Sequence, residues 1–154
     1  MEQTTGISAG ARIGDARVQE IFNAMNARTL HLVDELYAAD VRFVDPFHVV
    51  EGREPLRDYY RRMYANVRSI RFDFSGSLST PAELVLYWTM TFRHPRLRGG
   101  EAVSLEGCTR LCFATEGTDI GKVVLHRDYF DAGALLYEHV PVLGAAIRFL
   151  RGRV

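Results

Sequence analysis

The stretch VRFVDPFHVVEGREPLRDYY, Val41 to Tyr60, predicts a strand, a turn and a helix in direct succession. Phe43 and Asp45 share one face of the strand, because successive side chains of a strand point to opposite sides. Pro46 ends the strand, and Gly52 precedes the helix. A carboxylate on the apolar face of a strand either costs stability or serves a function, so Asp45 is a candidate site residue.

The segments before this stretch predict helices, and the segments after it predict strands. Apolar residues recur at helical spacing over 15–25 and 32–37, and the helix after Gly52 carries a wide apolar stripe as far as Val67. After Val67 the pattern alternates, and residues 75–82 are rich in turn-forming types. The predicted later strands are residues 70–74, Leu84–Arg93, Ala102–Phe113 and Lys122–Phe130, followed by a helical tail from Asp131.

Short connections between successive strands indicate an antiparallel sheet, so the predicted class is α+β. We expect a curved antiparallel sheet that forms a cone around the N-terminal helices and one long helix, with a C-terminal helical tail. At 154 residues the chain is one domain, over residues 13–154, after a disordered N-terminus of residues 1–12.

Composition favours an ordinary globular protein: 47% of residues are hydrophobic, 25% are charged, and the formal net charge is +0. Such a balance gives no global attraction to nucleic acid. Cys108 and Cys112 lie too far apart on one strand to pair, which indicates free thiols and a reducing compartment. Because the first residues also lack a secretory-signal pattern and no stretch is long enough to span a membrane, we expect a cytoplasmic protein.

The tail carries an apolar stripe with three arginines beside it. The stripe is Val140, Leu143, Ile147 and Leu150, and the arginines are Arg148, Arg151 and Arg153. The favoured interpretation is a helix that packs on its own sheet or on a second copy. The alternative is a basic amphipathic helix that contacts a membrane surface.

Two motifs carry a family resemblance. YAADVRFVDPFHVVEGREPLRDYY, residues 37–60, resembles the first-strand segment of ketosteroid isomerases, and GKVVLHRDYFD, residues 121–131, resembles the last strand of SnoaL-like polyketide cyclases. Together they indicate the nuclear-transport-factor-like superfamily, which also includes limonene epoxide hydrolases. The resemblance covers about residues 15–131 and implies the SnoaL-like cone fold, although this fold hosts enzymes and binding modules alike.

The resemblance also implies site residues. Asp45 matches the general base of the isomerase, and Asp128 matches the acid/base aspartate of the cyclases, with His126 two residues earlier on the same face. The isomerase's two oxyanion donors correspond here to Ile21 and to a position near Thr109. Neither is an equivalent donor, so the resemblance does not extend to the isomerase's own mechanism.

Each candidate residue also has a structural interpretation. Asp45 before proline can simply cap a turn, and His126 with Asp128 can be a structural hydrogen-bonded pair. The predicted pocket wall is Phe43, Tyr59, Tyr60, Met63 and Trp88, which would suit an apolar or aromatic small molecule. No metal motif, phosphate loop or nucleophile elbow is present, so we expect neither a metal nor a cofactor.

Two functions remain open. The first is a cofactor-independent acid/base enzyme of the isomerase, cyclase or hydrolase type that uses Asp45 with Asp128 and His126. The second is a non-catalytic ligand-binding or dimerisation module. A homodimer is expected in either case, because the strand Leu84–Arg93 is apolar on both faces.

Overall fold

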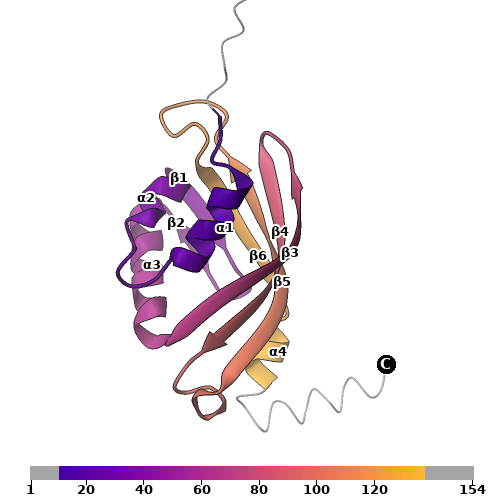
Figure 1. Cartoon of the computed structure of the whole chain (residues 1–154). Coiled ribbons are helices and arrows are strands. Elements are labelled where there is room, and N and C mark those ends of the chain that lie inside the picture. The colour runs from indigo at the N-terminus through magenta and orange to yellow at the C-terminus, as the bar shows by residue number, and fades with distance from the viewer. Residues whose placement is uncertain (1–10, 138–154) are drawn as a thin grey trace, which may run out of the picture.

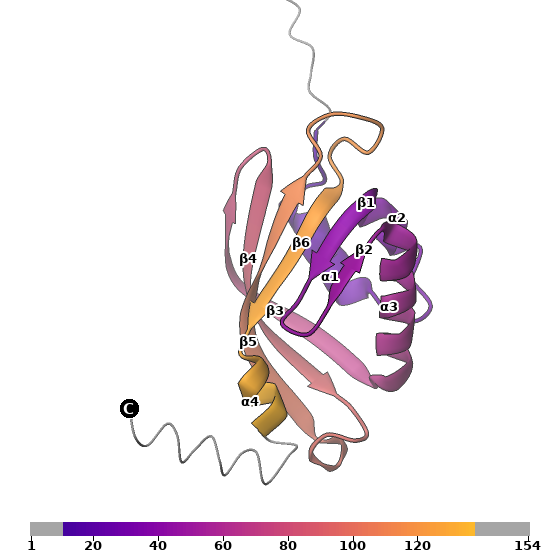
Figure 2. The same cartoon turned by 180° about the vertical axis from the view of Figure 1, so that it is seen from behind.

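The computed structural model describes residues 11–137, and its central feature is a six-stranded curved sheet with helices against its concave face (Figures 1 and 2). The class is α+β, as predicted. In chain order the elements are α1 (Asp15–Ala24), α2 (Leu32–Leu36), β1 (Tyr37–Val44), β2 (Val49–Glu51), α3 (Arg53–Asn66), β3 (Ser69–Ser79), β4 (Glu83–Arg93), the 3-10 turn η1 (Arg98–Gly100), β5 (Ala102–Phe113), β6 (Val123–Phe130) and α4 (Ala132–Tyr137).

The strand order is β2-β1-β6-β5-β4-β3. The three neighbouring pairs among β3, β4, β5 and β6 are antiparallel, as their short connections predict. The expectation of a wholly antiparallel sheet is corrected at one place: β1 pairs with β6 in parallel, with Phe43 opposite His126. The long connection between β1 and β6, which includes α3 and four strands, permits this parallel pairing, whereas a hairpin would not.

Three strands differ from the sequence prediction. Strand β1 begins at Tyr37, a residue predicted to be helical, rather than at Val41. The short strand β2 follows the turn after Asp45 and folds back on β1, with Val50 opposite Phe43. Strand β3 continues to Ser79 through residues predicted to turn, and its register shifts between Phe74 and Gly76. Such a shift breaks the hydrophobic alternation that marks a strand, and residues 75–79 are exposed, so the polar types there suit an edge strand.

The core lies between the concave face of the sheet and helices α1 to α3 (Figure 1). Its largest fully buried side chains include Ile21 from α1, Leu36 from α2, Leu56 from α3 and Leu86 from β4. The convex face of the sheet is more open, since Leu78, Tyr87 and Tyr129 are exposed. One face of each strand therefore defines the interior, and any cavity must lie among the inward side chains.

At the N-terminal end of the described region, the Arg12 guanidinium binds the Asp15 carboxylate at 2.7 Å and the Thr80 carbonyl at 3.1 Å. Most of the segment expected to be disordered lies outside the described residues. At the other end α4 follows β6 directly, and the rest of the predicted tail, from residue 138, also lies outside them.

Candidate functional site

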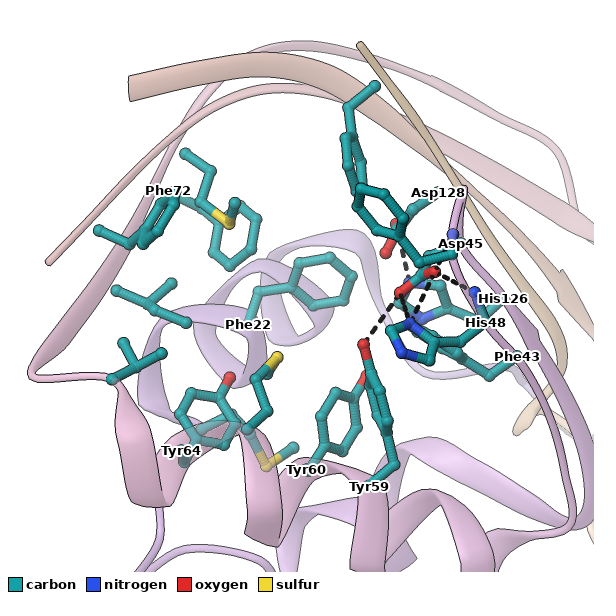
Figure 3. A pocket seen from close by; sticks show the side chains of 18 of the residues that line it. Phe22, Phe43, Asp45, His48, Tyr59, Tyr60, Tyr64, Phe72, His126 and Asp128 are labelled. Atoms are coloured by element: carbon teal, nitrogen blue, oxygen red, sulfur yellow. Dashed lines mark hydrogen bonds and ion pairs between the residues drawn. The ribbon is translucent and has the colours of Figure 1, made fainter. Parts of the chain in front are cut away.

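A cavity of about 240 Å³ lies between the sheet and helices α1 and α3 (Figure 3). Its walls are mainly aromatic and aliphatic, and its polar groups gather at one end. The lining residues are Ile21, Phe22, Met25, Leu36, Tyr37, Phe43, Asp45, Phe47, His48, Tyr59, Tyr60, Met63, Tyr64, Val67, Ile70, Phe72, Met90, Phe92, His126, Asp128, Phe130 and Leu135. A concave, largely apolar site with a few polar groups is typical of small-molecule binding.

The parallel pairing of β1 with β6 explains why the polar groups meet. Phe43 on β1 lies opposite His126 on β6. Two residues further along each chain come Asp45 and Asp128, which keep the same facing because side chains alternate along a strand. All three predicted catalytic residues, Asp45, His126 and Asp128, therefore line one cavity.

Asp45 is largely buried, with 7% of its side chain exposed, and its hydrogen bonds serve both interpretations of this residue. Oδ1 accepts the backbone N–H groups of Phe47 at 2.7 Å and His48 at 2.6 Å, so Asp45 caps the β1–β2 turn. Oδ2 accepts the Tyr59 hydroxyl at 2.9 Å, and His48 Nδ1 lies 3.1 Å from Oδ1. Asp45 is thus a turn former that also faces the cavity, and its acceptor capacity is nearly filled.

His126 and Asp128 belong to a chain of buried hydrogen bonds. His126 Nε2 lies 2.9 Å from Asp128 Oδ1, which also accepts the Thr109 hydroxyl at 2.5 Å. On the other side of the ring, His126 Nδ1 lies 2.8 Å from the Tyr37 hydroxyl, which is 2.8 Å from the Tyr60 hydroxyl. Within residues 11–137, the hydrogen bonds of Asp128 all fall on Oδ1, which leaves Oδ2 as its open oxygen.

If Asp128 is ionised and His126 is neutral, donor and acceptor chemistry leaves one direction for the hydrogen bonds along this chain. The carboxylate can only accept, so neutral His126 donates from Nε2 and accepts at Nδ1 from Tyr37. Tyr37 then accepts from Tyr60. Burial raises the pKa of Tyr37 and of Tyr60 far above the ordinary tyrosine value, so both hydroxyls stay protonated at neutral pH.

Tyr59 and Tyr64 are also held in the protonated form. Burial raises the pKa of Tyr59, and the neighbouring charges of Asp45 and Asp128 raise it further. Burial alone raises the pKa of Tyr64.

Four of the five residues predicted to line the pocket do so: Phe43, Tyr59, Tyr60 and Met63. The fifth, Trp88, is a correction. Its side chain packs in the core, where its indole N–H donates to the Thr109 hydroxyl at 2.8 Å. A buried indole needs an acceptor for its N–H, and Thr109 supplies one behind the cavity wall.

Sequence reasoning missed Tyr37 and the part played by Thr109. Tyr37 opens β1 and belongs to the first motif, but its contact with His126 spans 89 positions of the chain. Ile21 and Thr109, at the isomerase's donor positions, are both fully buried here. The Thr109 hydroxyl is engaged with Asp128, so neither position offers an oxyanion donor to the cavity.

The described region was also compared with the requirements of a metal site and of a membrane-spanning helix. Across residues 11–137, no cluster of three or more His, Cys, Asp or Glu side chains is arranged to hold a metal ion. The helices of the same region are all too short or too polar to cross a membrane.

Comparison with solved structures identifies the fold. The chain aligns with an NTF2-like protein of unknown function from Burkholderia pseudomallei (18% identity, TM-score 0.65, 79% of this chain and 91% of the other). It aligns with an LEH-like epoxide hydrolase of M. tuberculosis (20% identity, TM-score 0.62, 80% of this chain and 79% of the other). It also aligns with a hypothetical protein of ketosteroid isomerase-like fold from Catenulispora acidiphila, in complex with trimethylamine (15% identity, TM-score 0.62, 79% of this chain and 87% of the other).

No protein of curated function matches the sequence at a significant level. The family assignment rests instead on a sequence profile, since residues 18–126 match that of the SnoaL-like domain. This segment covers most of the chain and includes Asp45, Thr109 and His126, with Asp128 just beyond its end. The chain belongs to the SnoaL-like domain family.

Proposed function

We propose that this protein is a cofactor-independent acid/base enzyme that acts on a small apolar molecule bound in the cavity. Asp128 takes a proton from the bound molecule and returns it. His126 orients the Asp128 carboxylate by a hydrogen bond, and Asp45 supplies a second negative charge beside Tyr59. The observation that carries the proposal is the asymmetry of Asp128, with Oδ1 held by His126 and Thr109 and Oδ2 open in an otherwise apolar cavity.

This assignment shifts the principal role from Asp45, which the sequence motif favours, to Asp128. A carboxylate with its lone pairs already occupied must lose a hydrogen bond before it can take a proton from a substrate. Asp45 accepts two backbone N–H groups and the Tyr59 hydroxyl, whereas Asp128 has a free oxygen. General acid–base catalysis by a group so placed contributes about 10²- to 10⁴-fold to a rate.

A second function is favoured by one specific observation. The hydroxyls of Tyr59 and Tyr60 and the Nε2–H of His126 all donate to groups within the protein, so they cannot stabilise negative charge that develops on a substrate. The hydroxyl of Tyr64 has no hydrogen-bond partner within residues 11–137 and remains available. If Tyr64 cannot reach the reacting oxygen, the cavity would serve binding without turnover.

Proton transfer can be tested before the natural substrate is identified. β-Tetralone is a small apolar ketone with acidic α-hydrogens, and their exchange for deuterium in D₂O is measured by NMR. The carboxylate removes the α-proton, the electron pair moves to the ketone oxygen, and a deuteron returns to carbon. We expect the protein to accelerate exchange, and Asp128→Asn to lower that acceleration by about 10²-fold.

The matched control is Glu106→Gln, which removes one negative charge at an exposed position of β5, outside the cavity. Its exchange rate should equal that of the unchanged protein. Equal rates for Asp128→Asn and Glu106→Gln would reject Asp128 as the proton-transferring group. Binding of β-tetralone without any acceleration would favour the non-catalytic module.

We also propose that two copies associate through the convex face of the sheet and that the protein works in the cytoplasm. Leu78, Tyr87 and Tyr129 are 63%, 42% and 44% exposed on strands β3, β4 and β6. A two-fold dimer would cover them, and Cys108 and Cys112 are free thiols, as suits a reducing compartment. Sedimentation velocity at micromolar concentration tests the dimer, and a single monomeric species would contradict it.

A further inference from the structure

The polar end of the cavity accepts hydrogen bonds but has few donors to offer. Tyr59 donates to Asp45, and Thr109 donates to Asp128. The donor chain from Tyr60 through Tyr37 and His126 also ends at Asp128. Protein donors thus converge on the two carboxylates, while Oδ2 of Asp128 remains an open acceptor within the described part of the chain.

The same end is also unbalanced in charge. The sequence contains 19 Lys and Arg residues, yet the lining residues in the described region include neither type. Asp45 and Asp128 are the lining carboxylates, and the lining side chains beside them that can carry a positive charge are His48, half-exposed at the mouth, and the buried His126. With neutral histidines, both carboxylates keep their negative charge, and the apolar walls of the cavity screen that charge only weakly.

Aromatic rings surround these carboxylates. The ring of Phe43 lies 4.7 Å from that of His126 and 5.3 Å from that of Tyr59, measured between centroids. Phe47 and Phe130 pair at 6.1 Å near the mouth. The faces of such rings carry partial negative charge and attract organic cations, by about 0.5–2 kcal/mol for each good contact.

At the opposite wall, Tyr64 points into the cavity from α3 (Figure 3). Its pKa is raised by burial, so its hydroxyl keeps its proton. Among the described side chains of residues 11–135 no group hydrogen-bonds to that hydroxyl, so it can donate into the cavity. An acceptor on a bound ligand would satisfy it.

We propose that the ligand of this cavity is an organic ammonium ion, a protonated amine on an apolar body. The ammonium lies at the end of the cavity that holds Asp45 and Asp128, the body contacts the aromatic walls, and an acceptor at the far end meets Tyr64. Carboxylate ligands are disfavoured, because Asp45 and Asp128 repel them and the described lining residues include no Lys or Arg to attract them. The inference names a ligand class for the cavity of the proposed function, but it requires binding alone and no turnover.

Benzylammonium, benzyl alcohol and benzoate test the inference, since they share one ring and differ in charge. Their affinities are measured by calorimetry or by NMR chemical shifts at neutral pH and low salt. We expect benzylammonium to bind in the millimolar range, about tenfold tighter than benzyl alcohol, with benzoate weakest. The preference for the cation should shrink in Asp128→Asn, while the affinity for benzyl alcohol stays the same.

Glu106→Gln again controls for net charge, and it should keep the full preference. Equal or tighter binding of benzyl alcohol or benzoate would overturn the inference, as would failure of benzylammonium to bind at about 10 mM. An equal loss of all three ligands in Asp128→Asn would also contradict it. Deuterium exchange of β-tetralone is read separately: exchange without cation preference rejects this inference alone, and cation preference without exchange rejects only the catalytic proposal.

Discussion

At the scale of single residues, the two carboxylates of the cavity differ in how fully they are bound. Asp45 caps the β1–β2 turn with one oxygen and holds Tyr59 with the other. Asp128 receives its donors on one oxygen only. Asp45 could be identified from the sequence because Asp followed by Pro is itself typical of a turn at the end of a strand. The state of its lone pairs depends on Tyr59, and no local pattern encodes that contact.

Tyr37 provides the first prediction. Tyr37→Phe removes the hydroxyl between Tyr60 and His126 and leaves both without their hydrogen-bond partner in a buried site. We expect the free energy of unfolding to fall by about 1–3 kcal/mol, measured by urea denaturation. The ¹⁵N shifts of His126 should also change, because its Nδ1 loses the donor that fixes the tautomer.

Tyr64→Phe is the matched control for Tyr37→Phe. It removes a hydroxyl of the same kind from the same cavity, but one that has no hydrogen-bond partner within residues 11–137. Its stability should stay within about 0.5 kcal/mol of the unchanged protein. A similar loss in the free energy of unfolding in both variants would show that the hydrogen bonds of Tyr37 do not stabilise the protein.

At the scale of elements, long apolar runs between turn-forming segments made the central strands predictable. Strands β4 and β5 match their predicted bounds to within one residue, and β4 was predicted although its sequence is apolar on both faces. Strand β2 is three residues long, too short for a period to show. The parallel pairing of β1 with β6 joins segments far apart in sequence. The site depends on that pairing. Its residues could therefore be predicted from the sequence, but their positions relative to one another could not.

Strand β5 gives the second prediction, at Gly107. A Cβ atom placed there would lie 2.5 Å from Trp88 Cη2 and 2.6 Å from the Tyr129 carbonyl oxygen. The packed indole and the backbone cannot move away from the added methyl group without loss of stability. Gly107→Ala should therefore lower the free energy of unfolding by about 1–3 kcal/mol. Thermal and urea denaturation measure this loss.

Gly76→Ala on β3 is the corresponding control. Its nearest contact would be an ordinary 3.9 Å to Tyr87 Cδ2. Replacing glycine at an unstrained position reduces the freedom of the unfolded chain, so a small gain of stability, at most about 1 kcal/mol, is expected. A loss at Gly76 as large as that at Gly107 would contradict the steric explanation.

At the scale of the whole molecule, the buried tyrosines link stability to pH. The native pKa values of Tyr37, Tyr59, Tyr60 and Tyr64 lie above the value of about 10 for tyrosine in an unfolded chain. Below pH 10 both states are protonated and stability is unaffected. Above it the unfolded chain loses protons that the native protein keeps, so the free energy of unfolding falls by about 1.4 kcal/mol per tyrosine and pH unit.

Alkaline titration tests this third prediction. The near-ultraviolet absorbance of tyrosinate and the circular dichroism are followed in the same sample as the pH rises above about 10. We expect the four buried tyrosines to ionise only together with loss of native structure. Full ionisation of all tyrosines in a protein that still shows its native circular dichroism would contradict the burial on which the proton chain depends.

The central claim is that Asp128, rather than Asp45, is the carboxylate that exchanges a proton with the ligand. The most direct measurement is the rate of β-tetralone deuterium exchange in Asp128→Asn and Asp45→Asn, with ligand binding measured in the same samples. We predict a loss of about 10²-fold in Asp128→Asn with binding retained, and a loss below about tenfold in Asp45→Asn, whose amide oxygen can still cap the turn. The reverse order, with the large loss in Asp45→Asn and near-normal exchange in Asp128→Asn, would contradict the account.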